Sequence, residues 1–185
     1  MPHTARTVAS VLLAGLWLGG VAGGFAAWEA YDATPGPQAA GAAPPTGPAW
    51  ALTFYAHPHC PCTRAGLAEL AELARAAPEL DVTVVLVRPA GAEPGWERSP
   101  AWDAVPGARV RCDADGAEAA RVGAVTSGHA VLTDGAGRVA FRGGLTRARG
   151  RVGESPGRRA VLAILAGGEA PAEAPVYGCP LTDDR

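Results

Sequence analysis

Two cysteines separated by a single proline are the part of the sequence best suited to chemistry. Cys60 and Cys62 follow the apolar segment 50–56 and precede segment 63–77, in which leucine recurs at helical spacing. We therefore expect both thiols at a junction between a buried strand and an amphipathic helix. Unpaired N–H groups and the helix dipole favour negative charge at a helix N-terminus, and the thiolate is the nucleophilic form of cysteine. The pattern predicts a thiol that exchanges disulfide bonds.

The remaining segments that must position these thiols alternate between strand and helix patterns. Further strands are expected at 81–87, 108–112, 129–133 and 138–142, and further helices at 116–122 and 158–166. The segment Asp-Gly-Ala-Gly between the last two strands is a hairpin signal. This order predicts an α/β fold with a mixed sheet flanked by helices.

These segments together resemble the thioredoxin-like fold, and more closely the membrane-anchored periplasmic thiol-disulfide oxidoreductases and the bacterial RedB proteins. The resemblance covers residues 50–166 and is carried by FYAHPHCPCTRA, the VVLV strand, RVGAVTSGHAVLTDGAGRVAFRGG and the last helix. It implies catalytic roles for Cys60 and Cys62, protein thiols or disulfides as substrates, and an external redox protein as electron donor or acceptor. It also implies a substrate-facing loop formed by Thr126, Ser127, Gly128 and His129.

The sequence departs from that family at two places. The family has Cys-x-x-Cys, whereas this chain has Cys-Pro-Cys, so Thr63 stands at the second cysteine position when Cys60 is aligned with the nucleophile. The alternative alignment, through Pro61-Cys62, puts His59 at the nucleophile position; we favour the first. Gly128 stands where the family has a cis-proline, and glycine still allows close approach of a partner's backbone.

The other two cysteines have open roles at this level. Cys179 lies beyond the last predicted helix, and it is either a resolving cysteine that reaches Cys60 or Cys62, or a structural partner of Cys112, or part of a tethered tail. An exported protein with four cysteines favours paired thiols. Cys112, on a predicted strand, is expected to be a buried free thiol or a structural partner.

Metal binding is the main alternative to redox use of these thiols. His57, His59, Cys60 and Cys62 lie within six positions, and thiolate and imidazole ligands suit Cu(I) or Zn. The alternative site consists of Cys60, Cys62, His57 and His129, and it describes a thioredoxin-like copper-binding chaperone. A redox-inactive binding module is a third possibility. We favour thiol chemistry, which needs no cofactor.

The N-terminal segment differs from the rest of the chain. Residues 7–28 carry no charge, and as a helix they are long enough to cross a bilayer. Because Arg6 precedes this run and Glu29 follows it, the domain is expected on the extracytoplasmic, periplasmic side of the membrane. We expect a single-pass anchor or signal segment at 1–32, a Pro/Ala/Gly linker at 33–48, the thioredoxin-like domain at 49–168 and a tail at 169–185.

Composition excludes several other classes of protein. The 185-residue chain is 48% hydrophobic and 18% charged, with a net charge of -2. This charge argues against a nucleic-acid partner, because nucleic-acid binding depends on basic surfaces that neutralise phosphates. The absence of a sequence repeat and the presence of only 4 cysteines exclude collagen, coiled coils and disulfide scaffolds.

Overall fold

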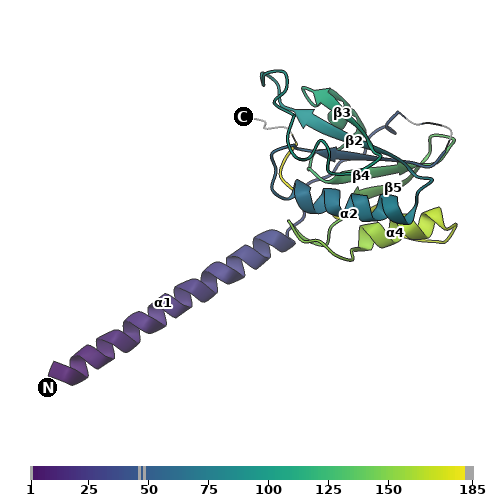
Figure 1. The fold of residues 1–185 in the computed structure, drawn as a ribbon. Coiled ribbons are helices and arrows are strands. Elements are labelled where there is room, and N and C mark those ends of the chain that lie inside the picture. The colour runs from purple at the N-terminus through teal and green to yellow at the C-terminus, as the bar shows by residue number, and fades with distance from the viewer. Residues whose placement is uncertain (1, 46, 48, 182–185) are drawn as a thin grey trace. The chain divides into compact units, whose positions relative to one another are not determined.

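The computed structural model describes residues 2–45, 47 and 49–181, which form an N-terminal helix and a folded domain (Figure 1). The chain divides into two compact units, residues 1–34 and 35–185. Helix α1, Pro2–Ala33, contains a candidate membrane span, Arg6–Ala33, whose most apolar 18-residue stretch has a mean hydropathy of 1.8 and no buried residue. The helix is therefore long and apolar enough to cross a bilayer, either as a retained anchor or as an export signal.

The domain is built on one six-stranded mixed sheet in the order β3-β2-β1-β4-β5-β6. Strands β1, β2 and β3 are parallel, whereas β4 is antiparallel to both β1 and β5. The strands are β1 (Ala51–Ala56), β2 (Asp81–Arg88), β3 (Arg109–Ala114), β4 (His129–Thr133), β5 (Val139–Gly144) and β6 (Glu173–Ala174). This topology, with a helix after β1 and another after the β4–β5 hairpin, confirms the predicted thioredoxin-like α/β fold.

Two helices cover one face of the sheet, α2 (Thr63–Ala76) and α4 (Pro156–Leu165) (Figure 1). Leu67, Leu70 and Leu73 recur along α2 and are buried with Phe54 of β1, so the helix presents one apolar stripe to the sheet. Helix α4 begins after Ser155, whose hydroxyl accepts the Arg158 N–H at 3.2 Å. This layer fixes the direction in which α2 leaves β1.

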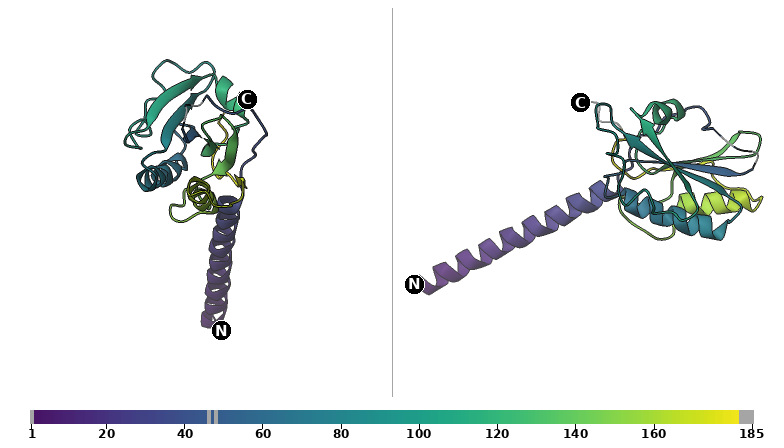
Figure 2. Two further views of the ribbon diagram at one scale, coloured as in Figure 1. Left: turned by 90° about the vertical axis from the view of Figure 1, so that its right-hand side faces the viewer. Right: turned by 45° about the horizontal axis from the view of Figure 1, so that its top comes forward.

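The opposite face carries the short helix α3 (Ala117–Val122) and a second apolar cluster (Figure 2). The cluster includes Tyr55, Val131 and, from the end of the chain, Leu181, which is 1% exposed. Burial of a leucine side chain contributes about 2 kcal/mol. The described part of the C-terminal segment therefore contributes side chains to the core, namely Ala174, Val176 and Leu181.

The predicted linker also belongs to the folded unit along much of its length. Gly36 donates its N–H to the carbonyl of Val176 at 2.8 Å, and the Arg142 guanidinium donates to the carbonyl of Gly41 at 2.6 Å. Small residues let this segment approach the backbone at the end of α3 closely: a side chain at Gly41 would collide with the Val122 backbone. Residues 36–42 thus lie on the domain, whereas the sequence favoured an extended spacer.

Gly66 of α2 packs closely against Phe54 of β1, which gives a test of this packing. A Cβ there would lie 2.7 Å from Cζ of Phe54. Overpacking costs about 1–3 kcal/mol and exceeds the gain of about 1 kcal/mol in helix propensity. We expect Gly66→Ala to lower the free energy of unfolding, measured by denaturant titration of the full-length protein in detergent.

Gly47→Ala is the matched control, because a Cβ at that position would be an ordinary 3.8 Å from the Asp81 carboxylate. Its free energy of unfolding should change by less than about 0.5 kcal/mol. A Gly66→Ala protein as stable as the parent would contradict the close packing of α2 on Phe54.

Candidate functional site

A closed chain of hydrogen bonds holds the turn between β1 and α2. The His57 N–H donates to Ser127 Oγ at 3.0 Å, Ser127 Oγ lies 2.8 Å from Thr63 Oγ1, and Thr63 Oγ1 donates to the His57 carbonyl at 2.9 Å. Because the Thr63 proton goes to that carbonyl, the Ser127 hydroxyl donates to Thr63. The turn is thereby fixed to the segment before β4. Thr63 has a structural role at the position where the family that the sequence resembles has its second cysteine.

Backbone amides surround the sulfur of Cys60. The backbone amides of Cys179, Cys62 and Thr63 lower the pKa of this thiol. The last two stand at the N-terminus of α2, where the Thr63 N–H also donates to the Cys60 carbonyl at 3.1 Å. Cys60 is only 6% exposed. Its sulfur is therefore buried among hydrogen-bond donors and not in hydrocarbon, as a stabilised thiolate requires.

Cys179 supplies a further donor from the end of the chain. Its Sγ lies 2.7 Å from Cys60 Sγ. The carbonyl of Cys179 accepts the Ser127 N–H at 2.8 Å, and the N–H of Leu181 donates to the Val125 carbonyl at 2.9 Å. This antiparallel pairing brings the two sulfurs together across 119 positions of sequence.

Cys62 completes a group of three thiols. The sulfur atoms of Cys60, Cys62 and Cys179 all lie within 4.8 Å of one another; we call them the three-cysteine cluster. Cys112 lies on β3 at the sheet edge, paired with Leu86 of β2, and does not belong to the cluster. The structure thus brings Cys179 to Cys60 and Cys62, and not to Cys112.

The three thiols differ in acidity, because negative charge on the Cys60 sulfur opposes ionisation of the other two. Burial raises the pKa of Cys60, but the hydrogen bonds from the Cys179 thiol and from the three amides outweigh it, so the pKa is lowered. Burial and the charge of Cys60 raise the pKa of Cys62. Burial and the hydrogen bond to Cys60 raise the pKa of Cys179 to about 12. Cys60 is therefore the most acidic thiol of the cluster, and the thiolate is the nucleophilic form.

Arg149 is a site residue that the sequence does not reveal. Its guanidinium donates to the carbonyl of Gly178, and its charge lowers the pKa of both Cys62 and Cys179 against the larger effect of burial. Arg149 lies in the loop between β5 and α4. In the sequence it is one of several arginines in a polar stretch, with nothing to distinguish it.

The histidines considered as metal ligands lie apart from the three-cysteine cluster. The rings of His57 and His59 pack against Trp96, with centroid distances of 5.2 and 4.4 Å, and His59 Nε2 lies 2.8 Å from the Trp96 carbonyl. Among residues 2–45, 47 and 49–181, the group of possible metal ligands at this site is Cys60, Cys62 and Cys179. It contains three sulfurs and no imidazole.

His129 stands on the sheet, opposite Tyr55 of β1. It is fully buried, and neither ring nitrogen has a hydrogen-bond partner within the part of the chain that the structure describes. It borders a pocket of about 290 Å³ with Arg142 and residues 38–41 of the linker segment. Burial and the positive charge of Arg142 lower the pKa of His129 to about 4, so the imidazole is neutral near pH 7.

The predicted substrate-facing loop is covered by the protein's own chain. Thr126 and Ser127 are 1% and 2% exposed, and the Thr126 hydroxyl donates to the Pro37 carbonyl at 2.6 Å. Gly128, with φ of +96°, donates its N–H to the Tyr55 carbonyl at 2.8 Å. A substrate that reaches Cys60 therefore contacts other surfaces of the protein and not this loop.

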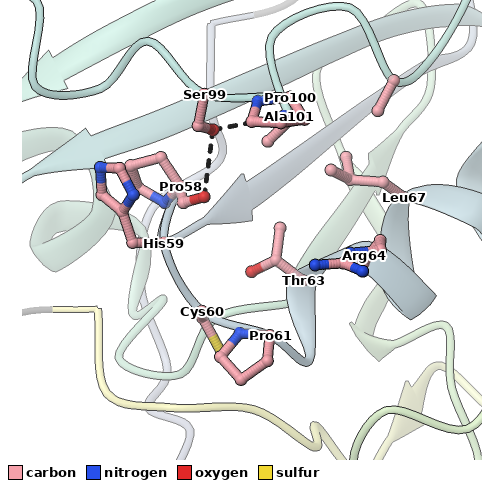
Figure 3. Close-up of a pocket in the computed structure, with 11 residues that line it drawn as sticks. Pro58, His59, Cys60, Pro61, Thr63, Arg64, Leu67, Ser99, Pro100 and Ala101 are labelled. Carbon is pink, nitrogen blue, oxygen red and sulfur yellow. Dashed lines mark hydrogen bonds between the residues drawn. The ribbon is translucent and has the colours of Figure 1, made fainter.

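One such surface is a pocket of about 290 Å³ beside Cys60 (Figure 3). Much of its lining is apolar, including Pro61, Leu67 and Ala101, and the side chain of Arg64 lies at one side. The Ser99 hydroxyl donates to the Pro58 carbonyl at 3.0 Å and ties the far wall to the turn. The pocket offers an apolar recess with one cationic group next to the thiolate.

Comparisons with known proteins agree on the fold. No family model and no curated protein matches the sequence. A hypothetical protein from Sinorhizobium meliloti 1021 is similar in structure, with a TM-score of 0.59 and 24% identity over 80% of this chain and 93% of that one. An uncharacterized conserved protein from Geobacillus kaustophilus has a TM-score of 0.60 and 17% identity over 81% of this chain and 92% of that one. A secreted disulfide oxidoreductase from Mycobacterium tuberculosis has a TM-score of 0.43 and 22% identity over 50% of this chain and 67% of that one.

The acidity of Cys60 gives a prediction for the reduced full-length protein. We expect the first thiolate absorbance to appear below the ordinary thiol value of 9.0 and to be lost in Cys60→Ala. Cys179→Ala should raise the pKa of Cys60, because a hydrogen bond to the charged sulfur is lost. Cys179→Ser retains a hydroxyl donor and should raise it less. Persistence of this first transition in Cys60→Ala would contradict the assignment.

The burial of neutral His129 gives a prediction for stability. In the folded protein the pKa of His129 is about 4, below the ordinary 6.5. Neutral His129 therefore makes its full contribution to the free energy of unfolding above pH 6.5, and this contribution is lost as the pH falls toward 4. The loss amounts to about 3 kcal/mol, at ~1.4 kcal/mol per pH unit. We expect His129→Leu to weaken the pH dependence of unfolding by denaturant over this interval. A variant with the parent's pH dependence would refute this account of His129.

Proposed function

We propose that the protein is a thiol-disulfide oxidoreductase in which Cys60 is the nucleophile and Cys179 the resolving cysteine. The observation that carries the proposal is the 2.7 Å contact between the Cys60 and Cys179 sulfurs. The thioredoxin-like fold supports it, because this fold presents a thiol at the end of a central strand and the start of a helix. The three amides at the Cys60 sulfur support it further, since they favour the thiolate.

The exchange takes place in two steps. The Cys60 thiolate attacks one sulfur of a substrate disulfide, the substrate S–S bond breaks, and the departing thiolate takes a proton from solvent. The Cys179 thiolate then attacks Cys60 Sγ in the mixed disulfide and releases the second substrate thiol. The substrate gains two electrons and two protons, and Cys60 and Cys179 form a disulfide; the reverse sequence oxidises a substrate dithiol.

The electrostatics of the cluster fit this order of events. The Cys60 thiolate is one cause of the raised pKa of Cys179. When Cys60 enters a mixed disulfide, its sulfur loses the negative charge. The hydrogen bond from Cys179 to that charge and the repulsion between it and a Cys179 thiolate are then both lost. The pKa of Cys179 then falls, and Arg149 favours its thiolate. The resolving thiol is thus protonated before the first step and becomes reactive after it.

The pocket beside Cys60 is the proposed contact surface for the substrate chain. Its apolar lining suits an aliphatic side chain near the reacting cysteine. Arg64 on its rim suits a nearby carboxylate. Protein thiols or disulfides with an apolar and an acidic neighbour are therefore the proposed substrates, and a separate redox protein restores the starting state of the cluster.

The location that fits this chemistry is the extracytoplasmic side of a membrane. Disulfides persist in oxidising compartments, and α1 is long and apolar enough to export or anchor the domain. The charges flanking α1, Arg6 before and Glu29 after the apolar run, favour a cytoplasmic N-terminus. We propose a single-pass protein with its domain on the periplasmic side.

The test is reduction of insulin disulfides by the full-length protein, with catalytic dithiothreitol as electron source. Cys60→Ser should lower the rate to that of dithiothreitol alone, because no other thiol of the cluster has a lowered pKa. Cys179→Ser should accumulate a mixed disulfide between Cys60 and the substrate, identified by peptide mass spectrometry. Cys62 should resolve the mixed disulfide poorly, because a Cys60–Cys62 disulfide would close a very small ring and would be strained.

Cys112→Ser is the matched control, since Cys112 lies outside the three-cysteine cluster, and it should retain the parent rate. Two outcomes would contradict the proposal. One is a parent-like rate in Cys60→Ser, and the other is a trapped mixed disulfide on Cys62 and not on Cys60.

A further inference from the structure

The three-cysteine cluster has the composition of a soft-metal site as well as that of a redox site. Its three sulfurs lie within 4.8 Å of one another and come from two parts of the fold, the start of α2 and the C-terminal segment. Thiolate ligands select Cu(I), zinc and iron–sulfur centres over hard cations. We propose that the reduced protein binds one Cu(I) ion through Cys60, Cys62 and Cys179.

The number of ligands favours copper over zinc. Structural zinc sites have four protein ligands in a tetrahedron. In the part of the chain that the structure describes, this group has three sulfurs, and His57 and His59 are turned to Trp96. Cu(I) is satisfied by a small number of thiolates, so three sulfurs form a complete donor set for it.

The geometry requires only side-chain adjustment. Three sulfurs each ~2.3 Å from a central ion are separated by about 4 Å. The cluster already lies within 4.8 Å, and the Cys60–Cys179 pair at 2.7 Å must open by about 1 Å, on the scale of a small side-chain rotation. The backbone pairing at Ser127 and Leu181 holds Cys179 in place meanwhile.

The surroundings suit a cluster of thiolates around a cation. The amides of Cys179, Cys62 and Thr63 favour a charged sulfur at Cys60, and Arg149 lies close enough to Cys62 and Cys179 to act on both. The net charge of three thiolates and one Cu(I) is negative, and these donors offset it. Binding releases the thiol protons to solvent and changes no oxidation state.

Metal binding and disulfide formation exclude each other at this site. A Cys60–Cys179 disulfide consumes two of the three ligands, so only the reduced protein can hold copper. The proposed redox chemistry therefore controls occupancy, and the two properties can be tested separately in the same protein.

The experiment is anaerobic competition of the reduced full-length protein in detergent against a chromophoric Cu(I) chelator, with Cu(I) as the probe. We expect one Cu(I) per chain. Each of Cys60→Ser, Cys62→Ser and Cys179→Ser should weaken binding at least ~10-fold, because loss of a residue that only orients a metal ligand already costs ~10- to 100-fold. Cys112→Ser and His129→Leu are the matched controls and should bind like the parent. The protein oxidised to a disulfide should not compete.

Three results would overturn the copper proposal: no competition by the reduced protein, parent-like binding in Cys62→Ser, or loss of binding in His129→Leu. Preference for Zn²⁺ with no Cu(I) binding would also overturn it. Absence of copper binding with normal insulin reduction would leave the oxidoreductase proposal intact, whereas copper binding without insulin reduction would contradict that proposal alone.

Discussion

The pairing of the C-terminal segment with the segment before β4 is the constraint on which the site depends. Two backbone hydrogen bonds, Ser127 to Cys179 and Leu181 to Val125, and the buried Leu181 side chain hold Cys179 against Cys60. Gly178 is required at this crossing, because a side chain there would collide with the Ser127 carbonyl. Without this pairing, Cys60 would keep its helix amides but lose its partner thiol.

The turn before α2 and the C-terminal segment contribute different groups to the site. The start of α2 supplies amides that stabilise a charged sulfur, and the hydrogen-bonded ring of His57, Ser127 and Thr63 keeps the turn in place. The C-terminal segment supplies the second sulfur. Thr63 thus holds the turn in position, and in the proposed exchange Cys179 takes the part that a second cysteine in the turn would have. The acidity of each thiol depends on the charge of the others, so one proton distribution serves both steps of the proposed exchange.

Much of the fold is predictable from the sequence because its signals are local. The apolar runs that became β1 and β2 and the leucine spacing of α2 predict these elements and place Cys60 and Cys62 at their junction. The sequence does not predict the partner of Cys179, because a contact across 119 positions depends on backbone pairing that has no periodicity. The linker was predicted to be an extended spacer, because Gly, Ala and Pro show no apolar pattern, yet its small residues pack by backbone contact. His129 lies in the strand His-Ala-Val-Leu-Thr, all of whose residues are buried, so the sequence does not indicate which face the imidazole occupies.

The central claim is that Cys60 and Cys179 form the redox pair. Peptide mapping by mass spectrometry of the oxidised full-length protein, with free thiols blocked before digestion, tests it most directly. The account predicts a crosslink between Cys60 and Cys179, with Cys62 and Cys112 recovered as blocked thiols. A crosslink between Cys60 and Cys62, or between Cys112 and Cys179, would contradict it.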